Sequence, residues 1–240
     1  MKTNKKFLII GAILIIIIII AAFVFTKNSA SIINNDNPQI GTSINGPIPQ
    51  SYAASKVPEV REGDKIFGSY DAPLKIFVYE DYLNAYSAVL ADTLDKIKAE
   101  TGDKIAIITR PYIINNSSSA SLAVAAINCA GEQGKWKEMR ALLFIRAKSQ
   151  PVGTADFNSY AQQLSLNENN FQICLTNEKK SGKIEQAMAE AKDYAVSGAP
   201  TIFIGSEMIL GARPYADFVD SNGDKIEGLK TVIDKKINIL

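Results

Sequence analysis

The sequence predicts an α/β domain whose elements follow the order β-α-β, a block of helices, and then β-β-α. Three observations predict it. An apolar run, Leu74–Tyr79, passes directly into a stretch of helical periodicity. Two further short runs rich in β-branched residues follow, Ile105 to Thr109 and Thr201 to Ile204. Between these two runs, residues from about 114–196 show helical spacing, so helices are inserted in the middle of the domain.

A single transmembrane helix is expected before this domain. The segment Phe7 to Phe25 carries no charge, and at 1.5 Å per residue it is about 28 Å long, close to the hydrocarbon thickness of a bilayer. Three lysines precede it and only Lys27 closely follows, so the positive-inside rule places residues 1–6 in the cytoplasm. The alternative is a cleaved secretory signal, whose apolar core is shorter and ends at a small-residue cleavage site.

Both interpretations export the rest of the chain. The uncleaved signal anchor at residues 7–25 is favoured, because the run is long and no convincing cleavage site follows it. We therefore expect a single-pass protein of the cell membrane, in contact with the lipid bilayer through Phe7 to Phe25. Its C-terminal domain is expected outside the cytoplasm, in the periplasm or at the cell exterior.

The remaining domain boundaries follow from composition. Residues 26–60 are rich in Asn, Ser, Pro and Gly and lack a sustained hydrophobic period, which predicts a flexible linker. Residues 61–240 have the pattern of one packed domain. No internal repeat is visible in the sequence.

Composition excludes several classes of function. The sequence has no histidine, which removes serine–histidine–acid triads, cysteine–histidine pairs and histidine-ligated metals, and two cysteines cannot form a four-sulfur zinc site. Four of the 26 basic residues lie in residues 1–27, which hold no acid, so the rest of the chain is mildly acidic. Such a body lacks the electrostatic footprint of a nucleic-acid-binding protein. We expect no metal and no cofactor.

The individual elements can be assigned in order. After the strand Leu74–Tyr79, Tyr86, Leu90, Leu94 and Ile97 form one stripe of a helix that Gly102 ends. Ile105 to Thr109 is expected to be the second strand of a parallel β-α-β unit. The helical block ends, by the same reasoning, at Gly198. Thr201 to Ile204, the turn Gly205-Ser206 and Met208 to Leu210 predict a hairpin, and Ile226 to Ile237 predicts a closing amphipathic helix.

Several short motifs occur in a specific order along this predicted frame. They are Asp71-Ala-Pro73, Glu80-Asp-Tyr82, Cys129-Ala-Gly-Glu-Gln-Gly-Lys-Trp136, Tyr160-Ala-Gln-Gln-Leu-Ser-Leu166, Phe171-x-x-Cys174 and Gly198-Ala-Pro-Thr-Ile-Phe-Ile-Gly205. Over about residues 63–222 the chain resembles the DsbA-like thioredoxin family, which comprises exported thiol–disulfide oxidoreductases of bacteria. The resemblance implies a thioredoxin fold with a helical insertion.

The family carries a Cys-Pro-Tyr-Cys type of active site between the first strand and its helix. Aligned on Tyr86, those positions are Asn84, Ala85, Tyr86 and Ser87. Disulfide exchange needs a thiolate to attack and a second thiol to resolve the mixed disulfide, so this turn cannot perform it. Asn84 is well suited to cap the helix, worth about 1 kcal/mol over Ala. The other interpretation is that Asn84 and Ser87 form a polar contact for a ligand.

Pro200 matches the family's cis-proline, which lies beside the cysteine pair. The resemblance implies that the backbone of Ala199, with Pro200 and Thr201, pairs with an extended polypeptide by adding a strand. The alternative is that Pro200 only sets the start of a strand. Relatives also use an acid near the site in proton transfer, where Glu80 and Asp81 stand in this sequence.

Cys129 and Cys174 lie on two apolar helical stripes of the inserted block. An oxidising compartment permits a disulfide between them, and some relatives of the family join these helices with one. The alternative is two buried free thiols, since cysteine packs well as a small hydrophobe.

Three functions from different classes remain open. The favoured hypothesis is a redox-inactive domain that binds exported or unfolded polypeptides, or a membrane or envelope partner protein. The second is a glutathione-using, serine-type relative of the fold, in which Ser87 would act. The third keeps oxidoreductase activity through Cys129 and Cys174 as a non-standard site.

Overall fold

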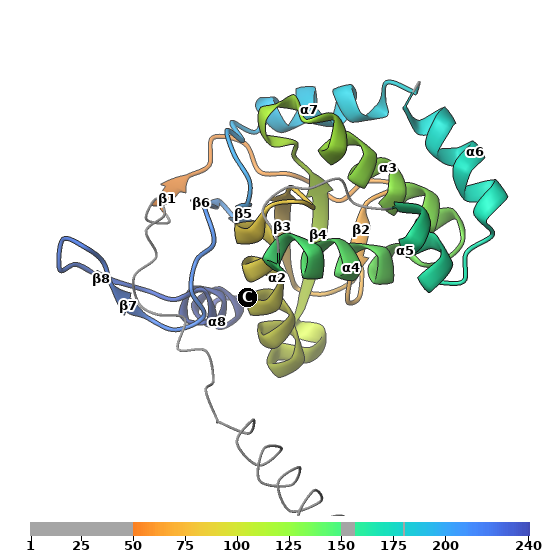
Figure 1. Ribbon diagram of the computed structural model, residues 1–240. Coiled ribbons are helices and arrows are strands. Elements are labelled where there is room, and N and C mark those ends of the chain that lie inside the picture. Colours follow the sequence, from red (N-terminus) through yellow and green to blue (C-terminus); the bar gives the residue numbers. More distant parts are fainter. Residues whose placement is uncertain (1–49, 150–156, 180) are drawn as a thin grey trace, which may run out of the picture. The chain divides into compact units, whose positions relative to one another are not determined.

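The computed structural model describes residues 50–149, 157–179 and 181–240 (Figure 1). The helices and strands are, in chain order, β1 (Gln50–Ala53), β2 (Lys65–Phe67), β3 (Leu74–Glu80), α2 (Ala85–Thr101), η1 (Gly102–Lys104), β4 (Ile105–Pro111), η2 (Ile114–Asn116), α3 (Ser118–Glu132), α4 (Trp136–Ser149), α5 (Phe157–Gln163), α6 (Glu168–Glu178), α7 (Lys183–Asp193), β5 (Thr201–Ile204), β6 (Glu207–Leu210), β7 (Phe218–Val219), β8 (Lys225–Ile226) and α8 (Leu229–Ile237). The predicted transmembrane segment lies outside the described residues.

Six strands form the main sheet in the order β1-β6-β5-β3-β4-β2. β3 and β4 are parallel, whereas β5 and β6 are antiparallel to their neighbours and to each other. This confirms the predicted α/β fold, with a parallel β-α-β unit followed by an antiparallel hairpin. The helices α3 to α7 lie between β4 and β5 in the chain.

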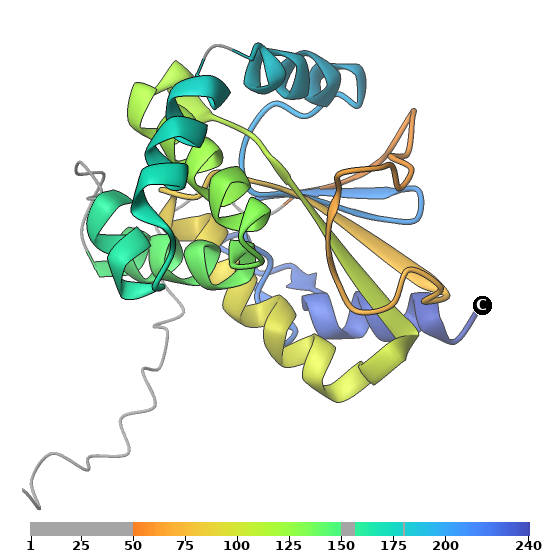
Figure 2. The ribbon, with the colours of Figure 1, turned by 90° about the vertical axis from the view of Figure 1, so that its right-hand side faces the viewer.

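The two faces of the sheet are covered differently. Residues of α2 and α8 share one apolar core with the strands, including Leu90, Leu94 and Val232. On the opposite face, Ala191 of α7 packs with Phe77 and other strand residues. Figure 2 shows α2 and α8 together below the sheet and α7 above it. The inserted helices α3 to α6 bury a third core, to which Ala88 and Ala91 of α2 and Ile184 of α7 also contribute.

Helix α2 begins and ends at the residues predicted from its sequence. The Asn84 side chain caps its first turn, and Gly102 follows its last residue with a positive φ of 57°. A left-handed backbone of this kind is favourable for glycine because it has no Cβ. The helix therefore begins and ends at the residues that sequence reasoning selects.

The predicted linker of residues 26–60 is wrong at its C-terminal end. Gln50–Ala53 form β1, which pairs antiparallel with β6 at the edge of the main sheet. Ala54 and Val60 pack against the core on the α7 face, and the Glu59 carbonyl accepts a hydrogen bond of 2.6 Å from Arg110 Nη2. These contacts are long-range, so the composition of a short polar stretch gives no sign of them.

Two further expectations need correction, and one short strand was not predicted. β2 is an additional edge strand, paired antiparallel with β4, and it has only three residues. α7 ends at Asp193 rather than at Gly198. The closing helix begins at Leu229, because Lys225–Ile226 instead pair with Phe218–Val219 in a separate two-stranded sheet.

Candidate functional site

The turn that opens α2 is closed by its own hydrogen bonds. Asn84 Oδ1 accepts from the Ser87 backbone N–H at 2.9 Å, and the Asn84 carbonyl accepts from the Ala88 N–H at 3.1 Å. Asn84 has an extended backbone with φ −97° and ψ 127°, as an N-cap residue normally has. The predicted helix-capping role of Asn84 is therefore the one that its side chain has here.

Ser87 points into the protein rather than toward solvent. The residue is 1% exposed, and its Oγ accepts a hydrogen bond of 3.2 Å from the Asp81 backbone N–H. A hydroxyl that is buried in this way is not presented to a soluble thiol or to glutathione. The position therefore acts as a buried link between the α2 turn and the end of β3.

Asp81 joins this turn to the inserted helices. Its Oδ1 accepts from the Leu83 N–H at 2.9 Å, and its Oδ2 accepts from the Ile114 N–H at 3.0 Å. Burial raises the pKa of the Asp81 carboxyl, while the two backbone hydrogen bonds oppose that shift. Both carboxylate oxygens are thus used to hold backbone groups on either side of the site.

A buried ion pair lies next to this turn. Arg140 of α4 donates from Nε to Glu80 Oε1 and from Nη2 to Glu80 Oε2, both at 2.7 Å. Glu80 is 1% exposed and Arg140 is 6% exposed. Burial raises the pKa of the Glu80 carboxyl, and the Arg140 guanidinium opposes this rise. The bidentate geometry joins the end of β3 to the helical block.

Sequence reasoning did not find Arg140. The residue lies four positions after Trp136 and four before Phe144, on the buried side of α4. The sequence did contain a sign of this pair, namely an arginine at a helix position that faces the core. A buried arginine normally has a carboxylate partner, so a partner could have been sought.

The outer surface of the same turn is apolar and exposed. Ala85 is exposed, Tyr86 is 45% exposed and Val89 is 37% exposed. These three side chains extend from the first two turns of α2. The site therefore combines a hydrogen-bonded interior at Asn84, Ser87 and Asp81 with an apolar outer face formed by Ala85, Tyr86 and Val89, which we call the α2 surface.

The Pro200 loop lies at the same end of the sheet. Thr201, the first residue of β5, pairs with Tyr79, which is five residues before Asn84. The Ala199–Pro200 peptide bond is cis, and the Pro200 carbonyl accepts from the Gly211 N–H at 2.8 Å. Thr201 Oγ1 donates to the Gly198 carbonyl at 2.7 Å.

Ala199 differs from its neighbours in this loop. It is partly exposed, and within the described residues neither its N–H nor its C=O makes a hydrogen bond. An unpaired donor and acceptor on one residue can together accept an extended chain, as the edge of a sheet does.

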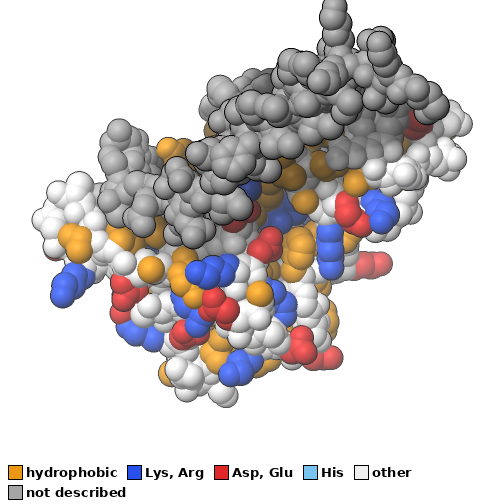
Figure 3. Space-filling view, turned by 60° about the horizontal axis from the view of Figure 1, so that its bottom comes forward, with side chains coloured by type: hydrophobic (Ala, Val, Ile, Leu, Met, Phe, Trp, Pro, Cys, Tyr) orange, Lys and Arg blue, Asp and Glu red, His pale blue; other side chains and the backbone are white. Residues whose placement is uncertain are grey.

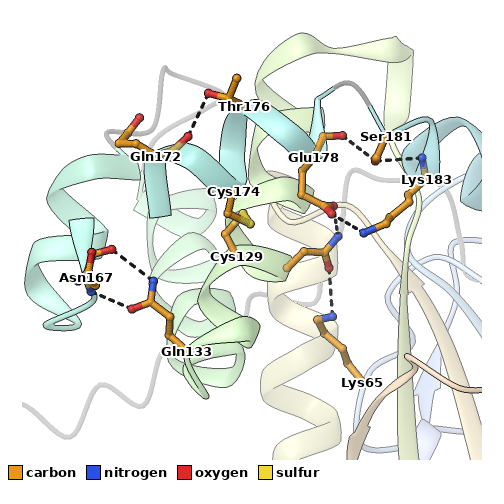
Figure 4. The surroundings of a disulfide bond; sticks show 11 residues. Lys65, Cys129, Gln133, Asn167, Gln172, Cys174, Thr176, Glu178, Ser181 and Lys183 are labelled. Atoms are coloured by element: carbon orange, nitrogen blue, oxygen red, sulfur yellow. Dashed lines mark hydrogen bonds and ion pairs between the residues drawn. A yellow bond between two sulfur atoms is a disulfide. The ribbon is translucent and has the colours of Figure 1, made fainter. Parts of the chain in front are cut away.

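The two cysteines occupy a separate region of the domain. Cys129 of α3 and Cys174 of α6 form a disulfide, with their Cα atoms 5.7 Å apart (Figure 4). This confirms the expected disulfide over the alternative of two free thiols. Cys129 is fully buried and Cys174 is 8% exposed. The structure brings Asn84–Ser87 and the Pro200 loop to one end of the sheet, whereas the disulfide joins two inserted helices.

Other kinds of site find little support in the described part of the chain. No group of three or more His, Cys, Asp or Glu side chains there is arranged to hold a metal ion. Basic and acidic side chains are intermixed on the face that Figure 3 shows. A search for membrane spans finds no sufficiently long and apolar helix within residues 50–149, 157–179 and 181–240.

Comparison with known proteins gives one family match. A protein-family model described as thioredoxin matches residues 61–224. Among curated relatives, two Na⁺/H⁺ antiporters match, NhaA 3 of Salinispora tropica at 26% identity over 66% of this chain and NhaA 1 of Salinispora arenicola at 25% over 65%. The chain spans about a quarter of the length of these relatives, 24% in each case.

Solved structures share the fold at low sequence identity. BdbD from Bacillus subtilis has a TM-score of 0.59 at 15% identity, over 74% of this chain and 94% of that one. A thioredoxin-like oxidoreductase from Silicibacter pomeroyi has a TM-score of 0.58 at 14% identity, over 75% and 92%. The α-DsbA1 of Wolbachia pipientis has a TM-score of 0.56 at 20% identity, over 75% and 94%. With a family model matched over more than half of its length, the chain belongs to the thioredoxin family.

Proposed function

We propose that this protein is a membrane-anchored, extracytoplasmic thioredoxin-fold domain that binds extended polypeptides and performs no thiol–disulfide exchange. The observation that carries the proposal is the Ala199 backbone, whose N–H and C=O are unpaired within the described residues. It lies at the same end of the sheet as the exposed apolar α2 surface. An extended chain would pair with Ala199, while the α2 surface would contact its apolar side chains.

Redox inactivity rests on where the sulfur atoms are. The sequence has two cysteines, and both are in the Cys129–Cys174 disulfide. The turn at Asn84–Ser87 has neither an attacking nor a resolving thiol. Because Ser87 is buried and its Oγ accepts from Asp81, the geometry also disfavours the glutathione-using alternative. The burial of Cys129 disfavours exchange at the disulfide itself.

Membrane attachment rests on the sequence of residues 7–25. It is further supported by the curated relatives, because the 159 residues of this chain that match form about a quarter of a protein named as a Na⁺/H⁺ antiporter. Resistance of the full chain to extraction by alkaline carbonate would support the anchor, whereas release into the soluble fraction would contradict it.

Polypeptide binding can be tested with reduced, carboxymethylated α-lactalbumin, which is permanently unfolded and has no free thiol. We expect the full chain in mild detergent to bind it, and Tyr86→Asp with Val89→Asp to weaken binding about tenfold or more, because charges would be placed against apolar side chains. Val219→Asp is the matched control, since Val219 is 61% exposed on the β7–β8 hairpin. No binding by the wild type, or equal losses in both variants, would contradict the proposal.

The redox part has its own test. The wild type should not accelerate oxidation of reduced ribonuclease by glutathione disulfide. The variant carrying Asn84→Cys and Ser87→Cys should accelerate it, because the fold would then place two thiols at a helix N-terminus. Activity in the wild type that Cys129→Ala removes would support the disulfide-based alternative instead.

A further inference from the structure

A cavity lies between the loop before β2, the end of β4, α3 and α7, and Tyr82 also lines it. Its volume is about 380 Å³. Val124 and Ile184 contribute apolar walls, while Lys65, Asn128 and Thr109 contribute polar groups. Val124 is 5% exposed and Ile184 is 9% exposed, so these walls are well shielded from water. The volume lies within the range of small-molecule pockets.

Most charged groups around this cavity are already paired. Arg110 donates to Asp64 from Nε at 2.9 Å and from Nη2 at 2.8 Å. Arg61 forms an ion pair with Glu190. Lys183 Nζ lies 2.7 Å from Glu178 Oε1 (Figure 4). These pairs leave little charge on those side chains to attract a further ligand.

Lys65 is different. Its Nζ donates to the neutral Oδ1 of Asn128 at 3.1 Å, and no carboxylate of the described residues lies within ion-pair distance of it. Asn128 Nδ2 in turn donates to Glu178 Oε2 at 2.8 Å, so the amide is fixed with its oxygen toward Lys65. Burial lowers the pKa of Lys65, while the carboxylates of Glu178 and Asp64 oppose that shift from beyond ion-pair distance.

A ligand for this cavity would need one negative charge and a small apolar part. The charge would pair with the Lys65 ammonium, and the apolar part would contact Val124 and Ile184. A dianion such as phosphate is disfavoured, because Glu62 and Glu190 also line the cavity. A carboxylate satisfies both requirements.

We propose that the cavity between β2, β4, α3 and α7 is a binding site for a small organic monocarboxylate, held by the Lys65 ammonium and the apolar walls Val124 and Ile184. This site is separate from the polypeptide-binding surface and does not depend on that proposal.

The test compares sodium butyrate with butyramide, its neutral analogue, and with sodium chloride at the same ionic strength. Backbone amide shifts of the ¹⁵N-labelled full chain are recorded in mild detergent during titration. We expect butyrate to shift Lys65, Val124 and Asn128 saturably, and butyramide to bind at least about tenfold more weakly. Shifts that are equal for butyrate and chloride, that fail to saturate, or that map elsewhere would overturn the proposal.

Two variants locate the site. Lys65→Met keeps most of the side-chain stem and should weaken butyrate binding about tenfold or more, while the exposed Lys104→Met should not. Ala187→Phe fills the cavity from α7 without removing a charge, and should also abolish the butyrate shifts. It keeps the test decisive if Lys65→Met does not fold. Butyrate binding that survives Ala187→Phe would overturn the proposal.

Discussion

The α2 turn and the α3–α6 contact are the two places in this domain where sulfur chemistry is at issue, and they differ in what holds them. At the α2 turn, Asn84 and Ser87 form hydrogen bonds with nearby backbone groups. Between α3 and α6, Cys129 and Cys174 form a covalent link over a sequence separation of 45. The α2 turn is held by contacts between residues close together in the chain. Helices α3 and α6 are held by a covalent bond between residues far apart in it.

This difference separates two roles of cysteine in one fold. A thiol at a helix N-terminus gains reactivity, whereas a disulfide between buried helices stabilises by restricting the unfolded chain. In this chain the Asn84–Ser87 turn has no cysteine, yet it still begins helix α2 with a capped first turn. The only two cysteines form the disulfide between the buried helices α3 and α6. Perturbing each region should therefore change stability by different amounts and for different reasons.

The largest effect is expected at the ion pair next to the α2 turn. Arg140→Leu should lower the free energy of unfolding by about 3–5 kcal/mol, because it leaves the Glu80 carboxylate buried without its partner. Urea unfolding followed by the fluorescence of Trp136 measures it. The exposed pair Lys148–Asp92 is the control, and Lys148→Leu should cost at most about 1 kcal/mol. Equal losses in the two variants would show that burial of the Glu80–Arg140 pair is energetically unimportant.

Removal of the disulfide should be the next largest effect. Cys129→Ala with Cys174→Ala should destabilise the domain by about 2–4 kcal/mol, since the unfolded chain regains conformational freedom. The affinity for carboxymethylated α-lactalbumin should stay unchanged, because the disulfide lies apart from the α2 surface. A loss of binding at a temperature where the variant is still folded would link the two regions and refute their separation.

At Asp81 we expect a smaller, pH-dependent effect. Asp81→Asn should cost about 1–3 kcal/mol at neutral pH, because an amide has one oxygen for the two N–H groups of Leu83 and Ile114. The pKa of Asp81 is raised on folding, so the folded protein binds this proton more readily than the unfolded chain. The contribution of Asp81 to stability therefore increases as the pH falls through the folded-state pKa.

The direction of this pH dependence can be measured directly. The stability advantage of the wild type over Asp81→Asn should increase when urea unfolding is repeated from pH 7 down toward pH 4. An advantage that decreases on acidification would mean that the Asp81 pKa is lowered on folding, contrary to the effect of its burial.

The smallest effect is expected at the helix cap. Asn84→Ala should cost about 1 kcal/mol, because the Ser87 N–H loses its acceptor, and Asn84→Asp should retain nearly all the stability. Thermal unfolding of both variants measures this difference. If Asn84→Ala were as stable as the wild type, the side chain would be available for a ligand rather than needed as a cap.

Much of the fold could be predicted from local sequence patterns. The strands β3, β4, β5 and β6 and the helix α2 each carry a continuous apolar run or a helical stripe, which depends on residues close together in the chain. β1 begins with the polar residues Gln50 and Ser51, and β2 has only three residues, so neither carries a continuous apolar run. They form only because β6 and β4 offer edges with which they pair.

The candidate site likewise has some features that the sequence predicts and others that it does not. Residue identity and spacing are enough to show that Asn84–Ser87 contains no thiol, that Asn84 suits a helix cap, and that two cysteines were available for one disulfide. The packing of the folded chain is needed to show that Ser87 is buried, that Arg140 pairs with Glu80, that Ala199 has an unpaired backbone within the described residues, and that Lys65 lines a cavity. Burial and pairing of these groups depend on segments far apart in the chain, and local patterns do not specify which of those segments meet.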